Sequence, residues 1–221
     1  MEAASRVVAS GQAGPHRDLD ALVGRHLAHP FRKPLLDYNR EAFAVAMAAR
    51  AAWNPGAPLI LDAGCGVGWS TLRLAGDHPG HFVIGVDQSL DRLQRGKPQP
   101  LPANAVLVRA DLVDFWRLLA GAGFRLARHY VLYPNPWPKI GHLARRWHGH
   151  AVFPVWRELG GVVEVRSNWR VYIDEMARAL ELLGATSIEA AGFATDDPMT
   201  PFEKKYLASG HALWRCTADL G

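Results

Sequence analysis

The sequence predicts an α/β protein built on a doubly wound, mainly parallel sheet of seven strands. Short apolar segments alternate along the chain with segments of helical periodicity. The apolar segments in the first half are hydrophobic on both faces, as strands inside a parallel sheet are. The first of them runs directly into a glycine-rich turn and a helical segment, which is a typical connection in such folds. Together these observations indicate a sheet with helices on both faces.

The first half of the chain contains four predicted strands. A helix is expected within residues 33–53, where apolar residues recur at helical spacing, and a short apolar run at 59–62 predicts the first strand. Ser70 is a candidate cap for the helix after the glycine turn. Further strands are expected at 81–87, 105–111 and 128–133, and helices at 70–78, 89–96 and 112–123.

The second half adds one strand, one long helix and a terminal strand pair. A strand is expected at 160–168, and residues 168–184 carry an apolar stripe at helical spacing. The stripe consists of Trp169, Tyr172, Met176, Leu180 and Leu183. Segments 186–193 and 211–217 resemble a terminal strand pair. Three aromatic residues before the fifth strand are expected to pack on the sheet: Trp147, Phe153 and Trp156.

Composition favours one domain with one hydrophobic core. The chain has 221 residues, of which 49% are hydrophobic, and this suffices for one well-buried core. We expect a flexible N-terminal tail at 1–20 and a single domain at 21–221. A monomer or a homodimer fits the sequence.

Charge and cysteine content indicate which kind of partner and which cell compartment fit the protein. Lys plus Arg number 25 against 21 Asp plus Glu, and the pI is near 9.3, so an anionic partner such as RNA fits the charge. Cys65 and Cys216 are far apart and predict neither a disulfide framework nor a zinc site. The sequence has no signal-peptide core and no apolar run long enough to span a membrane. A cytoplasmic protein is therefore expected.

The turn after the first strand, LDAGCGVGWS, has the features of a nucleotide-type binding site. Its glycines, Gly64, Gly66 and Gly68, alternate as G-x-G-x-G, which permits positive backbone angles and close approach of a ligand. A dinucleotide site has G-x-G-x-x-G instead. Glycine-rich turns also occur in ordinary strand-to-helix connections, and Asp residues at strand ends also cap helices.

Three carboxylates accompany the turn. Asp62 precedes the first glycine, and Asp87 and Asp111 end the second and third predicted strands. This spacing resembles the first motif of class I methyltransferases, whose cofactor is S-adenosylmethionine. The resemblance implies that Asp62 accepts hydrogen bonds near the methionine end of the cofactor, directly or through water. It also implies that Asp87 binds the ribose hydroxyls and that Asp111 reaches the adenine amine.

A second unusual segment, YPNPWPK at 133–139, follows the fourth strand, at the same sheet edge as the turn. Together with SNWRVYIDEM at 167–176 and TPFEKKY at 200–206, it resembles the three signatures of bacterial tRNA (guanine-N7)-methyltransferases. The resemblance covers roughly residues 57–215 in the family's order and implies the Rossmann-like class I methyltransferase fold. It implies methyl transfer to N7 of a guanosine in tRNA, at position 46 of the variable loop.

The resemblance also assigns roles to individual residues. It implies cofactor contact from Asn135 and substrate contact from Lys139, Asn168, Thr200 and Glu203. Guanine N7 has no proton to remove, so the transfer needs alignment and stabilisation of the purine cation more than a general base. Asn135 and Glu203 are therefore the candidate catalytic residues, with Glu203 as the acidic group.

Two positions depart from the family pattern. The family has Asp where this chain has Asn135, and Thr-Asp where it has Ser167 and Asn168. Carboxylates stabilise a purine cation better than amides do, so two other functions stay open. One is methylation of an exocyclic amine or a small molecule through the Asn-Pro-Trp-Pro loop, which faintly resembles the loop of amine methyltransferases. The other is a catalytically silent protein that binds RNA.

A basic, histidine-rich run follows at 139–150. Alone, such a run fits a solvated helix face, but beside an acceptor loop it predicts contact with RNA phosphates. Arg145 and Arg146 are the candidates for this contact, with Trp137 stacking on an unpaired base. The histidines of the run lack Cys or carboxylate partners at a metal-binding spacing, so no metal site is predicted.

Overall fold

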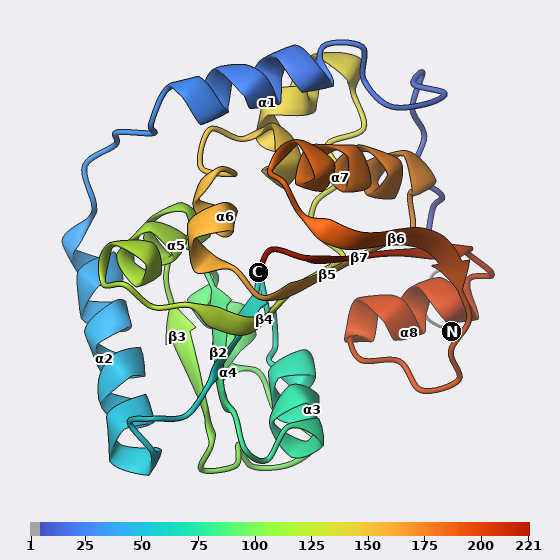
Figure 1. Ribbon diagram of the computed structural model, residues 1–221. Coiled ribbons are helices and arrows are strands. Elements are labelled where there is room, and N and C mark those ends of the chain that lie inside the picture. Colours follow the sequence, from blue (N-terminus) through green and yellow to red (C-terminus); the bar gives the residue numbers. More distant parts are fainter. Residues whose placement is uncertain (1–4) are drawn as a thin grey trace.

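The protein has one seven-stranded sheet in the order β3-β2-β1-β4-β5-β7-β6, seen in a computed structural model that describes residues 5–221 (Figure 1). The first five strands are parallel to one another, whereas β7 runs antiparallel between β5 and β6. The predicted doubly wound, mainly parallel seven-stranded sheet is therefore confirmed.

The strands lie close to the predicted segments. They are β1 (Leu59–Ala63), β2 (Phe82–Asp87), β3 (Ala105–Arg109), β4 (Leu126–Leu132), β5 (Val162–Ser167), β6 (Thr186–Phe193) and β7 (Leu213–Asp219). The terminal strand pair expected from the last two apolar segments is confirmed as β6 and β7.

The helices include five that the periodicity predicts and three that it does not. They are α1 (Leu19–Ala28), α2 (Asp37–Trp53), α3 (Trp69–Asp77), α4 (Leu90–Gln94), α5 (Leu112–Gly121), α6 (Val155–Leu159), α7 (Arg170–Leu182) and α8 (Pro201–Ala208). Two 3-10 helices, η1 (Ile140–Arg145) and η2 (Trp147–Gly149), follow β4. The sequence pattern places no helix at α1, α6 or α8. Helices α6 and α8 are too short to show a helical repeat of apolar residues, and the segment of α1 contains a glycine, Gly24, which disfavours a helix.

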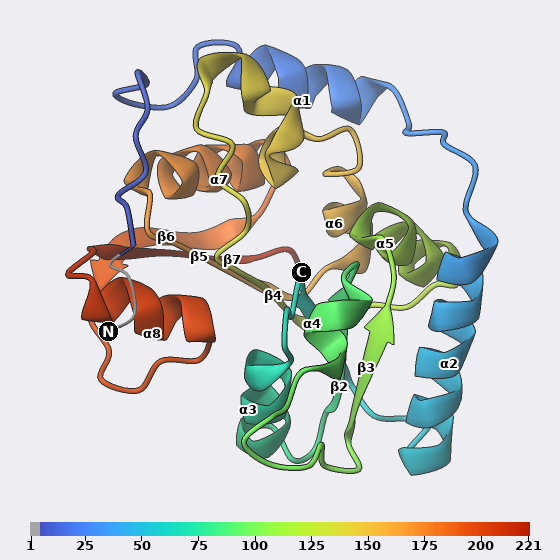
Figure 2. The same ribbon diagram turned by 180° about the vertical axis from the view of Figure 1, so that it is seen from behind.

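Helices cover both faces of the sheet. In Figures 1 and 2, α1, α6 and α7 lie on one side of the sheet and α3 and α8 on the other. Alternation along β1 matches this arrangement, since Leu59 and Leu61 join the larger apolar cluster, which includes α1 and α7 residues. Ile60 between them packs with Leu74 of α3 in a smaller cluster.

The helix α3 begins differently from the expectation. Ser70 was a candidate cap, but the cap position is Gly68, whose φ of 81° is left-handed. Ser70 lies inside the helix and its hydroxyl donates to the carboxylate of Asp62 at 2.6 Å. The serine therefore joins the helix to the end of β1.

The aromatic residues before β5 pack as predicted. Phe153 and Trp156 are fully buried in the larger cluster, and Trp147 is partly buried against it. Trp169 is also buried there, at 8% exposure.

The N-terminal residues make contacts with the rest of the fold. Val8 packs against the larger cluster, and α1 packs along α7. The division into a flexible tail at 1–20 and a domain at 21–221 stays a prediction. Across residues 5–221, no helix is both long and apolar enough to cross a membrane.

The sheet order brings the two unusual segments together. Because β1 pairs in parallel with β4, the glycine turn after β1 and the proline-rich segment after β4 leave the sheet at adjacent strand ends. On the other side of β1, β2 ends at Asp87 beside the same turn.

Candidate active site

The glycine turn is tied to the end of β2 and leaves its centre open. The amide of Gly64 donates to the carbonyl of Val86 at 2.8 Å. Gly66 has a φ of +59°, and a Cβ built there would meet nothing within 4 Å. A Cβ on Gly68 would lie 2.7 Å from the side chain of Leu107. The turn therefore requires glycine, and its backbone at Gly66 is accessible to a ligand.

Asp87 faces this turn from the end of β2. One of its carboxylate oxygens accepts from the amide of Gly66 at 3.0 Å, and the other accepts from the amide of Ser89 at 2.8 Å. Arg92 lies 3.8 Å from the same carboxylate. A carboxylate has about four lone-pair positions, so Asp87 can accept further hydrogen bonds from a ligand hydroxyl.

Asp111 caps α5 at the neighbouring strand end. Its Oδ1 accepts from the amide of Val113 at 2.8 Å, and its own amide donates to the side chain of Asn39 at 2.8 Å. Asn39 is fully buried in α2 and donates to Asp114 at 2.7 Å. The helix-cap interpretation of Asp111 thus holds, and the cap fixes the carboxylate in place beside the turn.

Asp62 is the most buried of the three carboxylates, at 1% exposure. One oxygen accepts from the hydroxyls of Ser70 and Thr71, at 2.6 Å each. Burial, with a smaller contribution from the charge of Asp87, raises the pKa of Asp62 to about 6 against the lowering effect of the two hydroxyls. Its charge therefore changes close to neutral pH.

The segment at residues 133–139, here called the proline-rich loop, contains two bulky residues in the left-handed backbone region. Tyr133 has a φ of 54° and Trp137 a φ of 44°. Such conformations cost of order 1–3 kcal/mol each and persist only where other contacts hold them. Asn135 is exposed between the two residues, and its side-chain oxygen accepts from the amide of Trp137 at 3.2 Å.

Glu203 holds the beginning of this loop. It is fully buried and accepts from the hydroxyl of Tyr133 at 2.6 Å, from Arg166 at 2.9 Å and from the amide of Met199 at 2.6 Å. Burial, together with the carboxylate, raises the pKa of Tyr133 well above its usual range, so the phenol keeps the proton that it donates. Glu203 is fully buried, so it presents no surface that a substrate could contact, unlike the role that the resemblance implies for it.

The Thr-x-x-Glu signature has a structural reason. Thr200 is the N-cap of α8, and its hydroxyl accepts from the amide of Glu203 at 3.0 Å. Glu203 reaches back to the amide of the residue before the cap, so the pair acts like a capping box. The signature therefore fixes the helix start beside Tyr133.

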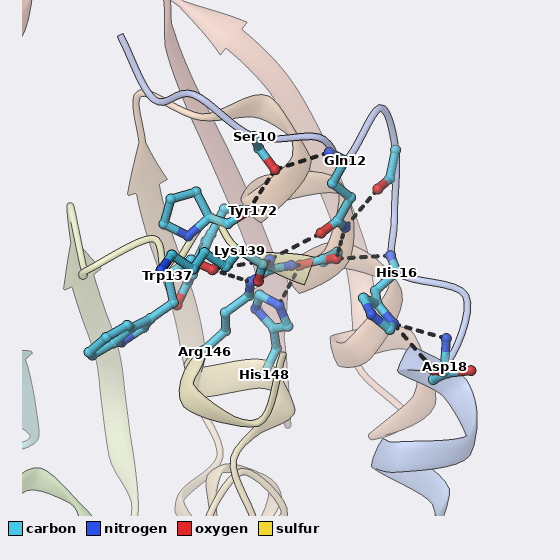
Figure 3. A network of polar contacts seen from close by, with 12 residues as sticks. Ser10, Gln12, His16, Asp18, Trp137, Lys139, Arg146, His148 and Tyr172 are labelled. Carbon is cyan, nitrogen blue, oxygen red and sulfur yellow. Dashed lines mark hydrogen bonds and ion pairs between the residues drawn. The ribbon is translucent and has the colours of Figure 1, made fainter. Parts of the chain in front are cut away.

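A buried ion pair holds the end of the loop (Figure 3). Arg146 and Glu175 are both fully buried, 2.5 Å apart, and His148 lies 2.9 Å from the same carboxylate oxygen. Arg146 also donates to the carbonyl of Trp137 at 3.2 Å. Burial opposes the ionisation of Glu175, but the hydrogen bonds and charges of His148 and Arg146 outweigh it and lower the pKa to about 2.

The placement of Arg146 corrects its expected role. The sequence suggests a phosphate contact, but the guanidinium donates to Glu175, to Gln12 and to loop carbonyls. The neighbouring Arg145 is exposed, with its guanidinium 4.9 Å from the ring centre of Trp137. Of the two arginines, Arg145 is the one that can reach a ligand from solution.

The remaining predicted substrate residues lie in different environments. Lys139 is exposed at the end of the loop, just before η1. Asn168 is half-buried and its side chain lies 3.1 Å from the ring of His211. Within residues 5–221, no group of three or more His, Cys, Asp or Glu side chains could hold a metal ion.

Comparisons with known proteins identify the family. A family model described as "Putative methyltransferase" matches residues 56–216. The tRNA (guanine-N(7)-)-methyltransferase of Bordetella pertussis is 31% identical over 180 residues, which are 74% of this chain and 68% of that protein. The chain belongs to the tRNA (guanine-N7)-methyltransferase family. A protein of the same name from Burkholderia lata is 27% identical to this methyltransferase over 215 residues, covering 91% of this chain and 77% of the relative.

Solved structures support the fold of this methyltransferase. A variant of 16S rRNA (adenine(1408)-N(1))-methyltransferase from Catenulisporales acidiphilia, with its cosubstrate, has a TM-score of 0.53 at 21% identity. The match covers 85% of this chain and 93% of that chain. At this identity the likeness concerns the fold alone. The class I methyltransferase fold and the family predicted from the three signatures are thus confirmed.

The sequence pattern does not single out several residues that hold the methyltransferase site. The main one is Glu175, although its position in the sequence indicates a buried partner. It lies three residues after Tyr172 and four before Ala179, on the buried face of α7. An acidic residue on an apolar stripe predicts a buried partner, which is Arg146. Arg166 gives a similar signal inside a buried strand.

We predict that Glu175→Gln lowers the free energy of unfolding by about 3 kcal/mol at neutral pH, because it leaves the buried Arg146 without its counter-charge. The pKa of Glu175 in the fold, about 2, is below its ordinary 4.5. The stabilisation is therefore present above pH 4.5 and lost as pH falls toward 2. Urea unfolding followed across this range should show the difference between variant and parent shrinking in acid.

The matched control is Glu158→Gln, an exposed residue of α6, which should change the free energy of unfolding by less than about 0.5 kcal/mol. A loss in Glu175→Gln that is the same at every pH would contradict the ionised pair.

Proposed function

We propose that this protein transfers a methyl group from S-adenosylmethionine to N7 of a guanosine in tRNA, at position 46 of the variable loop. The observation that carries the proposal is the parallel pairing of β1 with β4. It sets the glycine turn and the proline-rich loop at adjacent strand ends, so a methyl donor on the turn lies beside an acceptor at the loop. Membership of the family supports the choice of reaction and substrate.

The cofactor binds over the glycine turn in this proposal. The open backbone at Gly66, flanked by Gly64 and Gly68, fits a ligand that approaches closely. Asp87 accepts the ribose hydroxyls and Asp111 the adenine amine, because each keeps acceptor capacity beyond its contacts within the protein. When bound, S-adenosylmethionine supplies a methyl group on a positively charged sulfur.

Asp62 acts near the methionine end of the cofactor, directly or through water. Its buried carboxylate gains a favourable charge partner when a cationic ligand binds. The hydroxyls of Ser70 and Thr71 fix the orientation of this carboxylate.

The proline-rich loop receives the guanine. N7 attacks with its lone pair, so the protein has to align the base and stabilise the positive charge that forms on it. The side-chain oxygen of Asn135, exposed in the loop, offers a partial negative charge for this purpose. Glu203 acts as a positioning residue, since it holds Tyr133 at the beginning of the loop.

The tRNA lies against exposed positive charge next to this loop. Lys139 and Arg145 contact phosphates in the proposal, and Trp137 with its stacked Arg145 offers a ring for a base. Asn168 and Thr200 complete the substrate contacts from segments after β5 and before α8. The substrate is tRNA, so the proposed compartment is the cytoplasm.

The decisive experiment is mass spectrometry of nucleosides from tRNA incubated with the protein and S-adenosylmethionine. We expect 7-methylguanosine, distinguished by retention time and fragmentation from guanine or adenine methylated on an exocyclic amine. Cofactor turnover with no 7-methylguanosine in any tRNA would overturn the proposal. Turnover that yields a methylated exocyclic amine would assign the loop to that chemistry.

We predict that Asp87→Ala weakens cofactor binding by about tenfold or more, because hydrogen bonds to a charged group are worth about 1.5–3 kcal/mol. Calorimetry with S-adenosylmethionine measures this directly. Asp91→Ala, which removes an exposed carboxylate nearby, should leave the affinity unchanged. Unchanged affinity in Asp87→Ala would remove the ribose assignment.

We predict that the affinity for S-adenosylmethionine rises as pH increases through about 6. The pKa of Asp62 is about 6, so the carboxylate that attracts the cationic ligand is protonated below this pH. Affinity should change by up to about tenfold per pH unit below the pKa. In Asp62→Asn this dependence should disappear, while Asp91→Asn should keep it.

We predict that Asn135→Asp keeps or raises the rate of N7 methylation, because a full negative charge stabilises the purine cation better than an amide oxygen does. Single-turnover rates at saturating tRNA provide the measurement. Asn54→Asp, which adds the same charge at the exposed end of α2, is the control. A large loss in Asn135→Asp would mean that the loop is adapted to asparagine.

A further inference from the structure

The N-terminal segment at residues 10–16, here called the strap, lies against the proline-rich loop (Figure 3). The hydroxyl of Ser10 donates to the carbonyl of Pro138 at 2.6 Å. The two residues are 128 positions apart in the sequence, so the contact joins distant parts of the chain. The strap thus reaches the loop directly.

Gln12 gives the strap a second connection, through the buried ion pair. Its side-chain oxygen accepts from Arg146 at 3.0 Å, and its side-chain nitrogen donates to Glu175 at 2.5 Å. The amide of His16 donates to the same carboxylate oxygen at 2.9 Å. A neutral side chain with one donor and one acceptor is what this position requires, because it lies between a cation and an anion.

Arg146 of the ion pair connects Gln12 to the proline-rich loop. Arg146 donates from Nη2 to both Gln12 and the carbonyl of Trp137. Trp137 is one of the two loop residues with left-handed backbone, and its amide donates to the side chain of Asn135. A continuous set of hydrogen bonds therefore runs from Gln12 to the residue proposed to face the guanine.

We propose that Ser10 and Gln12 are positioning residues of the acceptor half of the site. The strap holds the proline-rich loop in the conformation that presents Asn135, and it does so without contacting the glycine turn. The role in catalysis rests on the proposed function, whereas the effect on the loop does not. Substitutions in the strap should therefore lower the rate of methyl transfer and leave the affinity for the cofactor unchanged.

The test uses Gln12→Met in the full chain, which keeps the length of the side chain and removes its three hydrogen bonds, to Arg146, to Glu175 and to the carbonyl of Gly14 within the strap. Ser10→Ala removes the other connection, the hydrogen bond from the Ser10 hydroxyl to the carbonyl of Pro138. Ala9→Ser is the matched control, an exposed position next to the strap. Three quantities are measured for each protein: the affinity for S-adenosylmethionine by calorimetry, the single-turnover rate at saturating tRNA, and amide hydrogen exchange over residues 133–146 without ligands.

We expect Gln12→Met to lower the single-turnover rate about tenfold or more, because small displacements of a positioning group have effects of this size or larger. Exchange over residues 133–146 should become faster, and cofactor affinity should stay within about twofold of the parent. Ser10→Ala should change the rate and the exchange in the same direction by less. Ala9→Ser should match the parent in all three measurements.

Unchanged exchange and an unchanged rate in both strap variants would overturn the proposal. Equal losses of cofactor affinity and rate would also overturn it, since they would reflect a general loss of structure. If the parent protein methylates no tRNA, the proposed function fails, and hydrogen exchange still decides whether the strap holds the loop.

Discussion

The arrangement of the acceptor half depends on one buried carboxylate, Glu175. A charged group in the interior is tolerated only when its oxygens are fully bonded, since removing one partner of such a pair typically costs several kcal/mol. Glu175 meets this requirement with Arg146 and His148 from the η1–η2 stretch and with the N-terminal strap, so its partners come from two distant parts of the chain. The requirement works in both directions, because each partner is also fixed by the carboxylate. The path of the chain from η1 to η2 and the strap is therefore set relative to α7.

A second buried carboxylate, Glu203, holds the other end of the proline-rich loop. It binds the hydroxyl of Tyr133, whereas Arg146 binds the carbonyl of Trp137. Glu203 and Glu175 are thus both occupied in holding the loop, directly and through Arg146. The polar chemistry offered to a base then comes from Asn135 and from backbone groups. This division agrees with a reaction that needs orientation of a lone pair more than removal of a proton.

The sequence predicts the sheet well because the signal for each strand is local. Buried strands are short apolar runs, and the glycine turn and β6 lie where the pattern places them. Placement of the charged residues could not be predicted in the same way. Arg146 stands in an exposed-looking basic run, and its burial depends on Gln12, which is 134 positions away, and on Glu175, which is 29 away. Glu203 presents the same difficulty, since two of its partners, Tyr133 and Arg166, come from the loop after β4 and from β5. A strand is recognisable from the local pattern of its apolar residues. A contact between side chains of distant segments produces no such pattern.

The left-handed residues of the proline-rich loop make its conformation depend on later parts of the chain. Tyr133 and Trp137 adopt backbone angles that neither would adopt in an isolated peptide, and each is held by an element formed later in the chain. Such a segment has no stable shape until α7 and α8 have docked on the sheet. The segment after β4 is therefore held through carboxylates of α7 and α8, whereas the glycine turn is bonded to β2. A chain that ended before α7 would contain every partner of the glycine turn but neither of the carboxylates, Glu175 and Glu203, on which the conformation of the loop depends.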